Sequence, residues 1–481
     1  MQVKSQPDEI ESFLTDASFI RDGHADRVVF PESVEDVSTI LARANDERVP
    51  VTVSGAGTGT VGGRVAFGGI VLATDKLNHI KSIVHEGDGG FAVAEAGVIL
   101  ADLQRAVDQQ GLLYPPDPTE RGCFIGGTVA TNASGARTFK YGPTRNYIRR
   151  LKVVLASGEV LDLRRGEQRA DAQGRLRLGK SIELTLPNYR MPATRKNASG
   201  YFIAPGMDAI DLFIGSEGTL GVICEVEVTL LPKPEGLLSG VVFFADEADV
   251  LALVAGARQR GDARAIEFFD NESLNFLREK YPNISREAVA AIFFEQETNE
   301  ATEEATLGQW MELLDEHHAL SDSWFATNEQ DQSKLREFRH QLPVLMNEWF
   351  ARYKQRKVST DMAVPDDAFA RLFHLYKDTL RASDLRYTVF GHIGDNHVHV
   401  NILPRDDAEG ARARELYVQF LKYAASVGGT LSAEHGVGKL KREYLRLFYT
   451  DAQLRAMAAV KKALDPNGLL GRGNIFSEEL I

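Results

Sequence analysis

The chain has 481 residues, of which 43% are hydrophobic and 26% charged, and its formal net charge is −13. This length predicts two or three domains with buried cores, and the acidic balance disfavours nonspecific binding to nucleic acid or to anionic lipid surfaces. Two cysteines are too few for a disulfide framework or an iron–sulfur cluster. The sequence has no run of about 18 apolar residues, so we expect no membrane span, and its polar, acidic start lacks a secretory signal pattern, which predicts a cytoplasmic protein.

The N-terminal part of the chain combines helix and strand patterns. Ser33 and Asp36 form a capping-box pattern ahead of apolar residues at helical spacing, which predicts a first helix. Apolar residues 51–53 predict a short strand that leads directly into a glycine-rich loop, and residues 70–73 predict the next strand. Residues 98–110 have the spacing of another helix. We therefore expect a mixed α+β domain here.

The loop after the first predicted strand has glycine at positions 55, 57, 59, 62 and 63. Because glycine has no Cβ and adopts positive φ, such a loop lets backbone N–H groups approach an anion closely. One such loop alone is more often a surface turn. No helix period follows it, which excludes the Rossmann fingerprint, and no Gly-Lys-Ser/Thr follows it, which excludes a P-loop. The loop instead indicates a cradle for a pyrophosphate.

Two further segments concentrate small residues. Residues 115–118, Pro-Pro-Asp-Pro, precede residues 125–135, Ile-Gly-Gly-Thr-Val-Ala-Thr-Asn-Ala-Ser-Gly, and residues 212–221 are Leu-Phe-Ile-Gly-Ser-Glu-Gly-Thr-Leu-Gly. Small side chains bury little apolar area, but they allow a flat ligand to lie against the backbone. Each segment alone is compatible with turn chemistry, whereas the three segments together exceed what turns require.

Residues 232–236, Pro-Lys-Pro-Glu-Gly, indicate the end of the first domain, because two prolines and a glycine cannot continue the preceding strand pattern. Helix patterns then alternate with strand patterns, which predicts a second α+β domain. The expected domains are 1–234 for the first, 235–450 for the second, and 451–481 for a C-terminal helix and tail that pack back on the first.

Histidines gather in the second domain, where four of the eleven lie close together in sequence: His392, His397, His399 and His435. Alternation along a predicted strand places His397, His399 and Asn401 on one face. Glu434 adds a carboxylate beside His435. Two imidazoles and a carboxylate suit Zn²⁺ or Mn²⁺ with an open position for substrate. The alternatives are a hydrogen-bond network at a domain interface and a zinc hydrolase, and no His-Glu-x-x-His is present to favour the latter.

The three small-residue segments, in this order and spacing, resemble the FAD-binding domain of the vanillyl-alcohol oxidase (p-cresol methylhydroxylase) superfamily. The resemblance implies a two-part FAD-binding domain followed by an α+β substrate, or cap, domain. Because the glycine loop is redundant unless it holds a pyrophosphate, we expect FAD rather than FMN. No histidine or cysteine lies within residues 55–63, so we expect no covalent link, although the nearby Cys123 leaves attachment open. The residues that the resemblance implies for FAD binding are Ser54, Gly55, Ala56, Gly57, Thr58, Gly59, Gly63, Pro116, Asp117, Gly126, Gly127, Thr131, Asn132, Gly135, Tyr141, Gly142, Glu217, Gly218, Gly221, Val222 and Ile223.

The second half resembles the C-terminal domain of FAD-linked D-2-hydroxyacid dehydrogenases, which carry Gly-His-x-Gly-Asp-Gly-Asn-x-His-x-Asn and Ser-x-Glu-His-Gly-x-Gly. This resemblance implies a metal site, a substrate contact, a base and a carboxylate anchor: His392, His399 and Glu434 for the metal, Asn401 for the substrate, His435 for the base and Arg339 for the anchor. Arg336, one turn earlier, remains an alternative anchor. The sequence departs from the motif at His397, where the family has asparagine, and Ser359 stands where the D-2-hydroxyglutarate branch has lysine, with Lys357 nearby.

The resemblance implies an FAD-dependent enzyme that oxidises a D-2-hydroxy acid, such as D-lactate, to the 2-oxo acid, with hydride passing to flavin N5. The expected metal is Zn²⁺, with Mn²⁺ and Fe²⁺ as alternatives. A glycolate oxidase-type subunit, a D-2-hydroxyglutarate dehydrogenase and a non-redox flavin or metal binder stay open as alternative functions. The expected partners are the hydroxy acid, an electron acceptor that is a quinone, a cytochrome or a flavoprotein, and a second copy in a homodimer, without nucleic acid.

Overall fold

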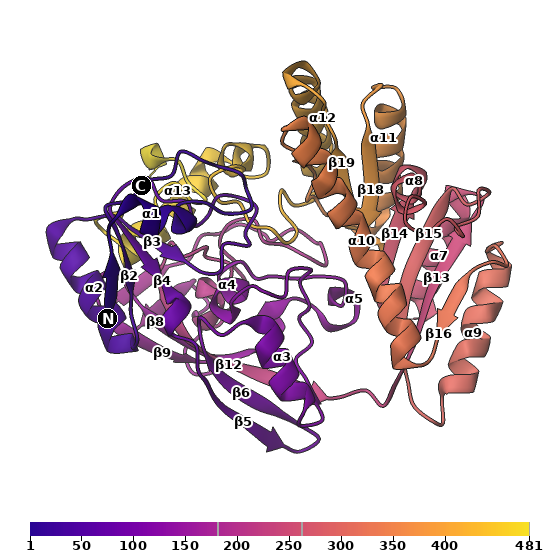
Figure 1. The fold of residues 1–481 in the computed structure, drawn as a ribbon. Helices are drawn as coiled ribbons and strands as arrows, with labels where there is room; N and C mark the ends of the chain where they lie inside the picture. The colour runs from indigo at the N-terminus through magenta and orange to yellow at the C-terminus, as the bar shows by residue number, and fades with distance from the viewer. Residues whose placement is uncertain (180–181, 261–262, 481) are drawn as a thin grey trace.

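The structure is a computed structural model that describes residues 1–179, 182–260 and 263–480. Figure 1 shows the N-terminal and C-terminal segments together in one part, with residues 236–426 beside them as a second part that has its own large sheet. Both parts combine helices with sheets, which confirms the expected α+β class. None of the described helices has the length and apolar character that a membrane crossing requires.

The smaller sheet of the first part carries the glycine loop. Its strands, in spatial order, are β1 (Gln2–Lys4), β2 (Arg27–Phe30), β4 (Ile70–Ala73) and β3 (Val51–Ser54), and the last three are parallel. Helix α2 (Val34–Glu47) connects β2 to β3. At its start the Ser33 hydroxyl accepts the Asp36 backbone N–H at 3.1 Å, which confirms the predicted cap. The glycine loop therefore leaves the carboxyl end of a parallel strand.

The larger sheet of the first part is antiparallel. Its strands, in spatial order, are β5 (Ile80–Glu86), β6 (Gly89–Glu95), β12 (Val222–Pro232), β8 (Ile148–Val154) and β9 (Val160–Arg164), with β7 (Leu112–Leu113) also paired to β12. The remaining elements of this part are α1 (Pro7–Ile10), α3 (Leu100–Asp108), α4 (Ile125–Ala130), α5 (Thr138–Tyr141), α6 (Ile210–Phe213), and the hairpin of β10 (Arg175–Leu178) and β11 (Ile182–Thr185).

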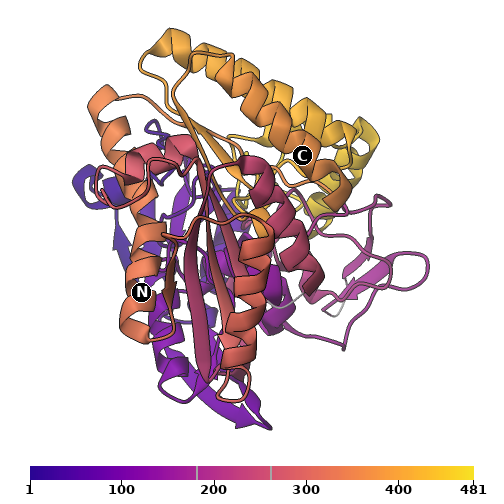
Figure 2. The same cartoon turned by 90° about the vertical axis from the view of Figure 1, so that its right-hand side faces the viewer.

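The second part is built on a seven-stranded antiparallel sheet. Its strands, in spatial order, are β16 (Trp324–Ala326), β13 (Gly236–Phe244), β15 (Ala290–Thr298), β14 (Ala263–Asp270), β18 (Tyr387–Gly391), β19 (His399–Ile402) and β17 (Val358–Ser359). Its helices are α7 (Glu247–Arg260), α8 (Asn271–Leu277), α9 (Glu303–Glu316), α10 (Glu329–Tyr353), α11 (Phe369–Arg381) and α12 (Asp407–Ser426). Figure 2 shows the long strands of this sheet with helices on either side of them.

Both faces of this sheet are buried. In β13, Val242 and Phe244 join one apolar cluster with α7 and α9, whereas Val241 and Phe243 join another with α8 and α10. A strand covered on both faces is a continuous apolar run, which is the pattern of residues 241–244. This sheet positions two of the four histidines, because His392 directly follows β18 and His399 begins β19.

The C-terminal segment returns to the first part. After α13 (Asp451–Leu464), the backbone N–H of Val51 donates to the carbonyl of Leu469 at 3.0 Å.

Between the two parts runs the loop of residues 432–438. The first part holds this loop through Glu217, which accepts the N–H groups of Val437 and Gly438 at 2.7 and 2.6 Å. The division of the chain at residues 234 and 450 stays a prediction.

Candidate active site

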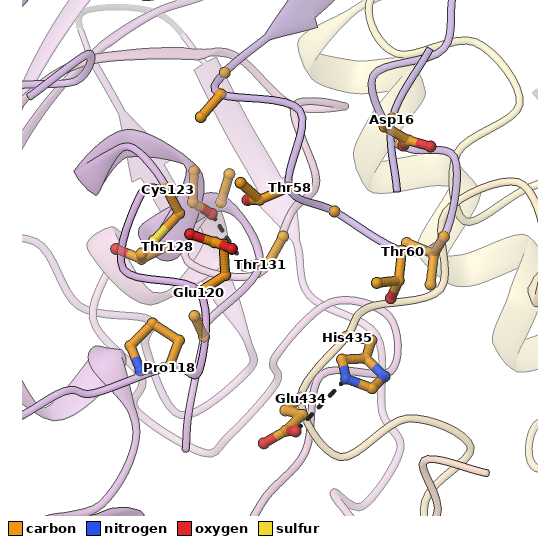
Figure 3. A pocket seen from close by; sticks show the side chains of 18 of the residues that line it. Asp16, Thr58, Thr60, Pro118, Glu120, Cys123, Thr128, Thr131, Glu434 and His435 are labelled. Carbon is orange, nitrogen blue, oxygen red and sulfur yellow. Dashed lines mark hydrogen bonds and ion pairs between the residues drawn. The ribbon is translucent and has the colours of Figure 1, made fainter. Parts of the chain in front are cut away.

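A cavity of about 420 Å³ lies between the two parts. Most of the residues that we expected to bind FAD line it: Gly55, Ala56, Gly57, Thr58, Gly59, Gly63, Gly126, Gly127, Thr131, Glu217, Gly218, Gly221 and Ile223. Four residues of the predicted catalytic and metal set line the same cavity: His399, Asn401, Glu434 and His435. Figure 3 shows Glu434 and His435 facing the same space as Thr58, Thr131 and Cys123.

Other predicted residues lie outside the wall of this cavity: Ser54, Pro116, Asp117, Asn132, Gly135, Tyr141, Gly142, Val222, His392 and Arg339. Several of them hold the structure around it. Asp117 forms a bidentate ion pair with Arg121 at 2.8 and 2.9 Å, and the Asn132 side chain accepts the Arg145 backbone N–H at 3.0 Å. These contacts explain their positions beside the cavity without a ligand contact of their own.

The glycines of the cavity wall fit a ligand that lies against the backbone. A Cβ atom at Gly59 or Gly127 would meet no protein atom within 4 Å, so the space beside each of them belongs to the cavity. Gly126 differs, because a Cβ there would lie 2.6 Å from the Ala96 Cβ, and it serves packing. An open cradle of small residues suits the pyrophosphate and flat ring of FAD.

Arg64 places a cation behind the glycine loop, which the sequence did not suggest. Its Nη1 donates to the Gly55 carbonyl at 2.7 Å and to the Ser54 hydroxyl at 3.2 Å, while Nε donates to the Thr15 carbonyl at 2.8 Å. Burial lowers the pKa of this guanidinium from its usual value, and arginine remains charged in proteins. Arg64 lines the cavity, so its charge favours an anionic ligand at the loop.

The outer partners of His392 and His399 determine which ring nitrogen of each carries hydrogen. His392 Nδ1 lies 2.6 Å from Glu267 Oε1, and His399 Nδ1 lies 3.0 Å from the carbonyl oxygen of Thr360. A carbonyl accepts only, and Glu267 is ionised because Arg339 and His392 lower its pKa against the effect of burial. Both Nδ1 atoms therefore carry hydrogen, and in the neutral rings both Nε2 atoms are acceptors.

The Nε2 atoms of His392 and His399 both point toward the Glu434 carboxylate. Its Oε1 lies 3.4 Å from His392 Nε2 and 3.2 Å from His399 Nε2. Burial disfavours its ionised form, but Lys196 and His392 hold the pKa of Glu434 well below its usual value. Lys196 is itself buried and lies 3.3 Å from Glu434 Oε2. Lys196 is a second site residue that the sequence did not suggest.

When both rings are neutral, these three acceptors face one another without a proton between them and cannot hydrogen-bond. A divalent cation satisfies all three, and two imidazoles with one carboxylate leave an open position. The three residues predicted as metal ligands thus fit a metal. When no cation is bound, a proton on His392 has the same effect. Burial opposes that proton, but the charges of Glu267 and Glu434 raise the pKa of His392 to about 9.

Asp361 organises the loop that carries Glu434 and His435. Its carboxylate accepts the His435 backbone N–H at 3.1 Å and the Lys441 ammonium at 2.6 Å, and it also binds the Ser432 hydroxyl. Burial opposes its ionisation, yet His435 and Lys441 hold the pKa of Asp361 well below its usual value. Its Oδ2 lies 3.3 Å from His435 Nδ1, so Nδ1 carries hydrogen and Nε2 is the acceptor.

His435 and Asn401 both line the cavity. The His435 side chain is 32% exposed, and its Nε2 lies 3.6 Å from Glu434 Oε1. Together with Asp361, His399 and Glu434, it forms a second set of potential ligand atoms. The Nδ2 atom of Asn401 is buried and has no hydrogen-bond partner among the described residues. An unused donor at the cavity wall suits an oxygen of a bound substrate.

The structure corrects our placement of His397 on a strand. Strand β19 begins at His399, because residues 393–395 form a single turn and Asn396 takes a left-handed conformation with φ of 55°. The alternation that we expected holds for His399 and Asn401 only. His397 is nevertheless fully buried beside them, and its ring centroid lies 4.5 Å from that of His399.

The predicted carboxylate anchor lies behind the cavity wall. Arg339 Nε donates to Glu267 at 3.0 Å, and its Nη1 lies 3.2 Å from His340 Nε2. Its Nη2 has no hydrogen-bond partner among the described residues. Arg336 lies 3.8 Å from Glu295. The cation that lines the cavity on this side is Lys357, an exposed residue. Partial desolvation by the protein around the cavity lowers the pKa of its ammonium.

Two known protein families match this chain, and solved structures share its fold. Residues 233–475 match the family described as FAD linked oxidases, C-terminal domain, and residues 25–164 match the family described as FAD binding domain. Solved structures of alkyldihydroxyacetonephosphate synthase share the fold. One superposes with a TM-score of 0.72 over 98% of this chain and 83% of that chain, at 16% sequence identity.

Curated proteins resemble the chain over nearly its whole length. A D-lactate dehydrogenase from Anaerostipes hadrus is 31% identical, over 97% of this chain and 93% of that protein. The glycolate oxidase subunit GlcD of Bacillus subtilis is 30% identical, over 94% and 89% of the two chains. A D-2-hydroxyglutarate dehydrogenase from Stutzerimonas stutzeri is also 30% identical, over 94% and 90%.

The open space beside Gly59 gives a test of the flavin cradle. We expect Gly59→Asp to abolish flavin binding without unfolding the protein, because a Cβ at this position meets no protein atom within 4 Å and the carboxylate beyond it would repel a pyrophosphate. Visible flavin absorbance per mole of purified protein measures the loss, and circular dichroism checks the fold. The matched control is Gly308→Asp, on an exposed part of α9 with equal free space. Unchanged flavin content in Gly59→Asp would contradict this assignment.

Proposed function

The chain belongs to the family of FAD-linked oxidases, and from this membership we propose that it oxidises a D-2-hydroxy acid to the 2-oxo acid with FAD as hydride acceptor. One observation carries the proposal: a single cavity has the glycine cradle in one wall and His399, Glu434 and His435 in another. A redox cofactor and a proton acceptor can thus meet one small substrate. The names of the similar curated proteins, which include D-lactate and D-2-hydroxyglutarate dehydrogenases, support this chemistry.

His435 is the proposed base. Asp361 holds its Nδ1–H and so directs the Nε2 lone pair away from the Asp361 carboxylate, toward the side where Glu434 Oε1 lies. A substrate hydroxyl bound between His435 and the group of His392, His399 and Glu434 would give its proton to His435 Nε2. FAD held by the glycine cradle would supply the hydride acceptor, and a cation held by His392, His399 and Glu434 would supply a Lewis acid that lowers the pKa of the substrate hydroxyl. The protein's own part is to position the base and the substrate.

Asn401 and two cations are the proposed binding groups for the substrate carboxylate. The free Nδ2 of Asn401 can donate one hydrogen bond. Arg339 keeps Nη2 free while Glu267 fixes its Nε, and Lys357 reaches the cavity directly. Arginine binds a planar carboxylate through two parallel N–H groups, whereas lysine supplies a point charge. We therefore retain Arg339 as the proposed anchor of the substrate carboxylate. Lys357 would attract the carboxylate by its positive charge alone.

A substrate screen tests the proposed reaction. We expect the purified yellow protein, mixed without oxygen, to lose its flavin colour with a D-2-hydroxy acid and not with the L-enantiomer, because the cavity presents hydride acceptor and base from fixed directions. The compounds are D- and L-lactate, glycolate, D-malate and D-2-hydroxyglutarate, followed by visible absorbance. Bleaching by none of these acids would favour a non-redox flavin or metal binder instead.

Substitution of the base separates proton transfer from binding. His435→Gln can still donate a hydrogen bond to Asp361 but cannot accept a proton, so flavin reduction should slow by about 100- to 10,000-fold. Flavin content should stay normal. Anaerobic stopped-flow absorbance measures the rate, and His374→Gln, on the exposed face of α11, is the matched control. A His435→Gln variant that reduces its flavin at the normal rate would remove His435 from the role of base.

The carboxylate anchor can be tested by keeping the charge and changing its shape. Arg339→Lys should lower kcat/KM through a higher KM, at a cost of roughly 1.5 to 3 kcal/mol for hydrogen bonds to a charged group. Steady-state kinetics with an artificial electron acceptor give both constants. Arg336→Lys, one turn away on α10, should behave like the unchanged protein. The reverse result would move the anchor to Arg336, and an effect from Lys357→Met alone would move it to Lys357.

A further inference from the structure

His397 is a fully buried histidine for which the proposed function has no use. Neither of its ring nitrogens makes a hydrogen bond of good geometry with the described residues. Its position is built into the fold: the Asn396 side chain binds both Arg258 and Asp366, which fixes the turn ahead of β19 and directs His397 inward. A buried imidazole nitrogen without a well-oriented hydrogen bond is costly, which indicates that His397 has another partner.

The surroundings of His397 determine its tautomer. Its Nε2 lies 3.1 Å from Asp361 Oδ1. The Asp361 carboxylate is ionised, because it also accepts the Lys441 ammonium at 2.6 Å and the His435 backbone N–H at 3.1 Å. A carboxylate only accepts hydrogen bonds, so the proton of the neutral His397 ring lies on Nε2. The lone pair of His397 is therefore on Nδ1.

No donor among the described residues serves this lone pair. The Glu434 carboxylate is an acceptor, and its Oε2 lies 3.9 Å from Nδ1. Lys196 is the neighbouring cation: it donates to the Gly135 carbonyl at 2.9 Å and to Glu434 Oε2 at 3.3 Å, its Nζ lies 3.3 Å from Asp395 Oδ2, and it makes no hydrogen bond with His397 Nδ1. The Nδ1 lone pair therefore lies beside other acceptors, namely Glu434 and the Nε2 atoms of His392 and His399.

We propose that His397 Nδ1 is a fourth ligand of the metal ion that His392, His399 and Glu434 hold. One potential ligand atom from each of these four residues lies within 4.8 Å of the others, so a single cation can reach all of them. This inference rests on the metal part of the proposed function and gives the site a composition of three imidazoles and one carboxylate.

This composition has chemical consequences. Four protein ligands complete a tetrahedral shell, so a hydroxy acid enters as a fifth ligand and the shell must expand. A third imidazole also increases the preference for nitrogen-binding ions such as Zn²⁺ and Co²⁺ over Mn²⁺, which favours carboxylate and water. Among the candidate metals, the site should therefore retain Zn²⁺ far better than Mn²⁺.

Metal competition tests the proposal on the flavin-containing protein. The protein is loaded with Zn²⁺ and titrated with a chelator, and free Zn²⁺ is measured by a colorimetric indicator. We expect His397→Asn to weaken Zn²⁺ binding by more than the roughly 10- to 100-fold that loss of an outer-shell partner costs. His374→Asn, on the exposed surface, should bind Zn²⁺ like the unchanged protein. Equal Zn²⁺ affinity in His397→Asn and the unchanged protein would overturn the proposal.

X-ray absorption of the Zn²⁺-loaded protein provides a second readout that needs no variant. The imidazole scattering should fit three rings in the unchanged protein, and two rings would overturn the proposal even if His397→Asn does not fold. A protein that binds no Zn²⁺ also overturns it. Anaerobic flavin reduction by the hydroxy acid is measured on the same samples. Reduction without any metal would leave the oxidation proposal intact while it removes the metal site and this fourth ligand together.

Discussion

The convergence of unprotonated acceptors on Glu434 is the constraint on which the site depends. Glu434 Oε1 lies within 3.4 Å of the Nε2 atoms of His392 and His399, and the outer partners of both histidines hold their hydrogens on Nδ1. Such an arrangement is stable only with a positive charge at its centre. Lys196 supplies part of that positive charge by donating a hydrogen bond to Glu434 Oε2. A metal ion, or a proton on His392, supplies the rest of the positive charge.

The loop of residues 432–438 connects this cluster to the flavin cradle. Asp361, from the second part, holds the backbone of His435, while Glu217, from the first part, accepts the N–H groups of Val437 and Gly438. Gly438 is required for this contact, because its φ is +51° and a Cβ would lie 2.2 Å from the Val61 carbonyl oxygen. The base and the glycine loop therefore keep a fixed relative position.

Sequence patterns predicted the local features of this protein well. The capped helix α2, the glycine loop and the grouping of His399, Glu434 and His435 all follow from residues that are near neighbours in sequence or that match a motif. Arg64, Lys196 and Asp361 were missed, because each acts on residues from 9 to 238 positions away and no local pattern marks them. The pairing of Arg339 with Glu267 and the turn that removes His397 from β19 likewise depend on tertiary packing. The exact domain division stays a prediction.

The most direct test of this account is the rate of flavin reduction by a D-2-hydroxy acid with and without the metal. The purified protein is assayed anaerobically by stopped-flow absorbance, then after chelator dialysis, and again after addition of Zn²⁺ or Mn²⁺, with elemental analysis of each sample. The account predicts that dialysis removes a bound metal and most of the reduction rate while flavin stays bound, and that metal addition restores the rate. Reduction at the full rate in protein shown to contain no metal would contradict it.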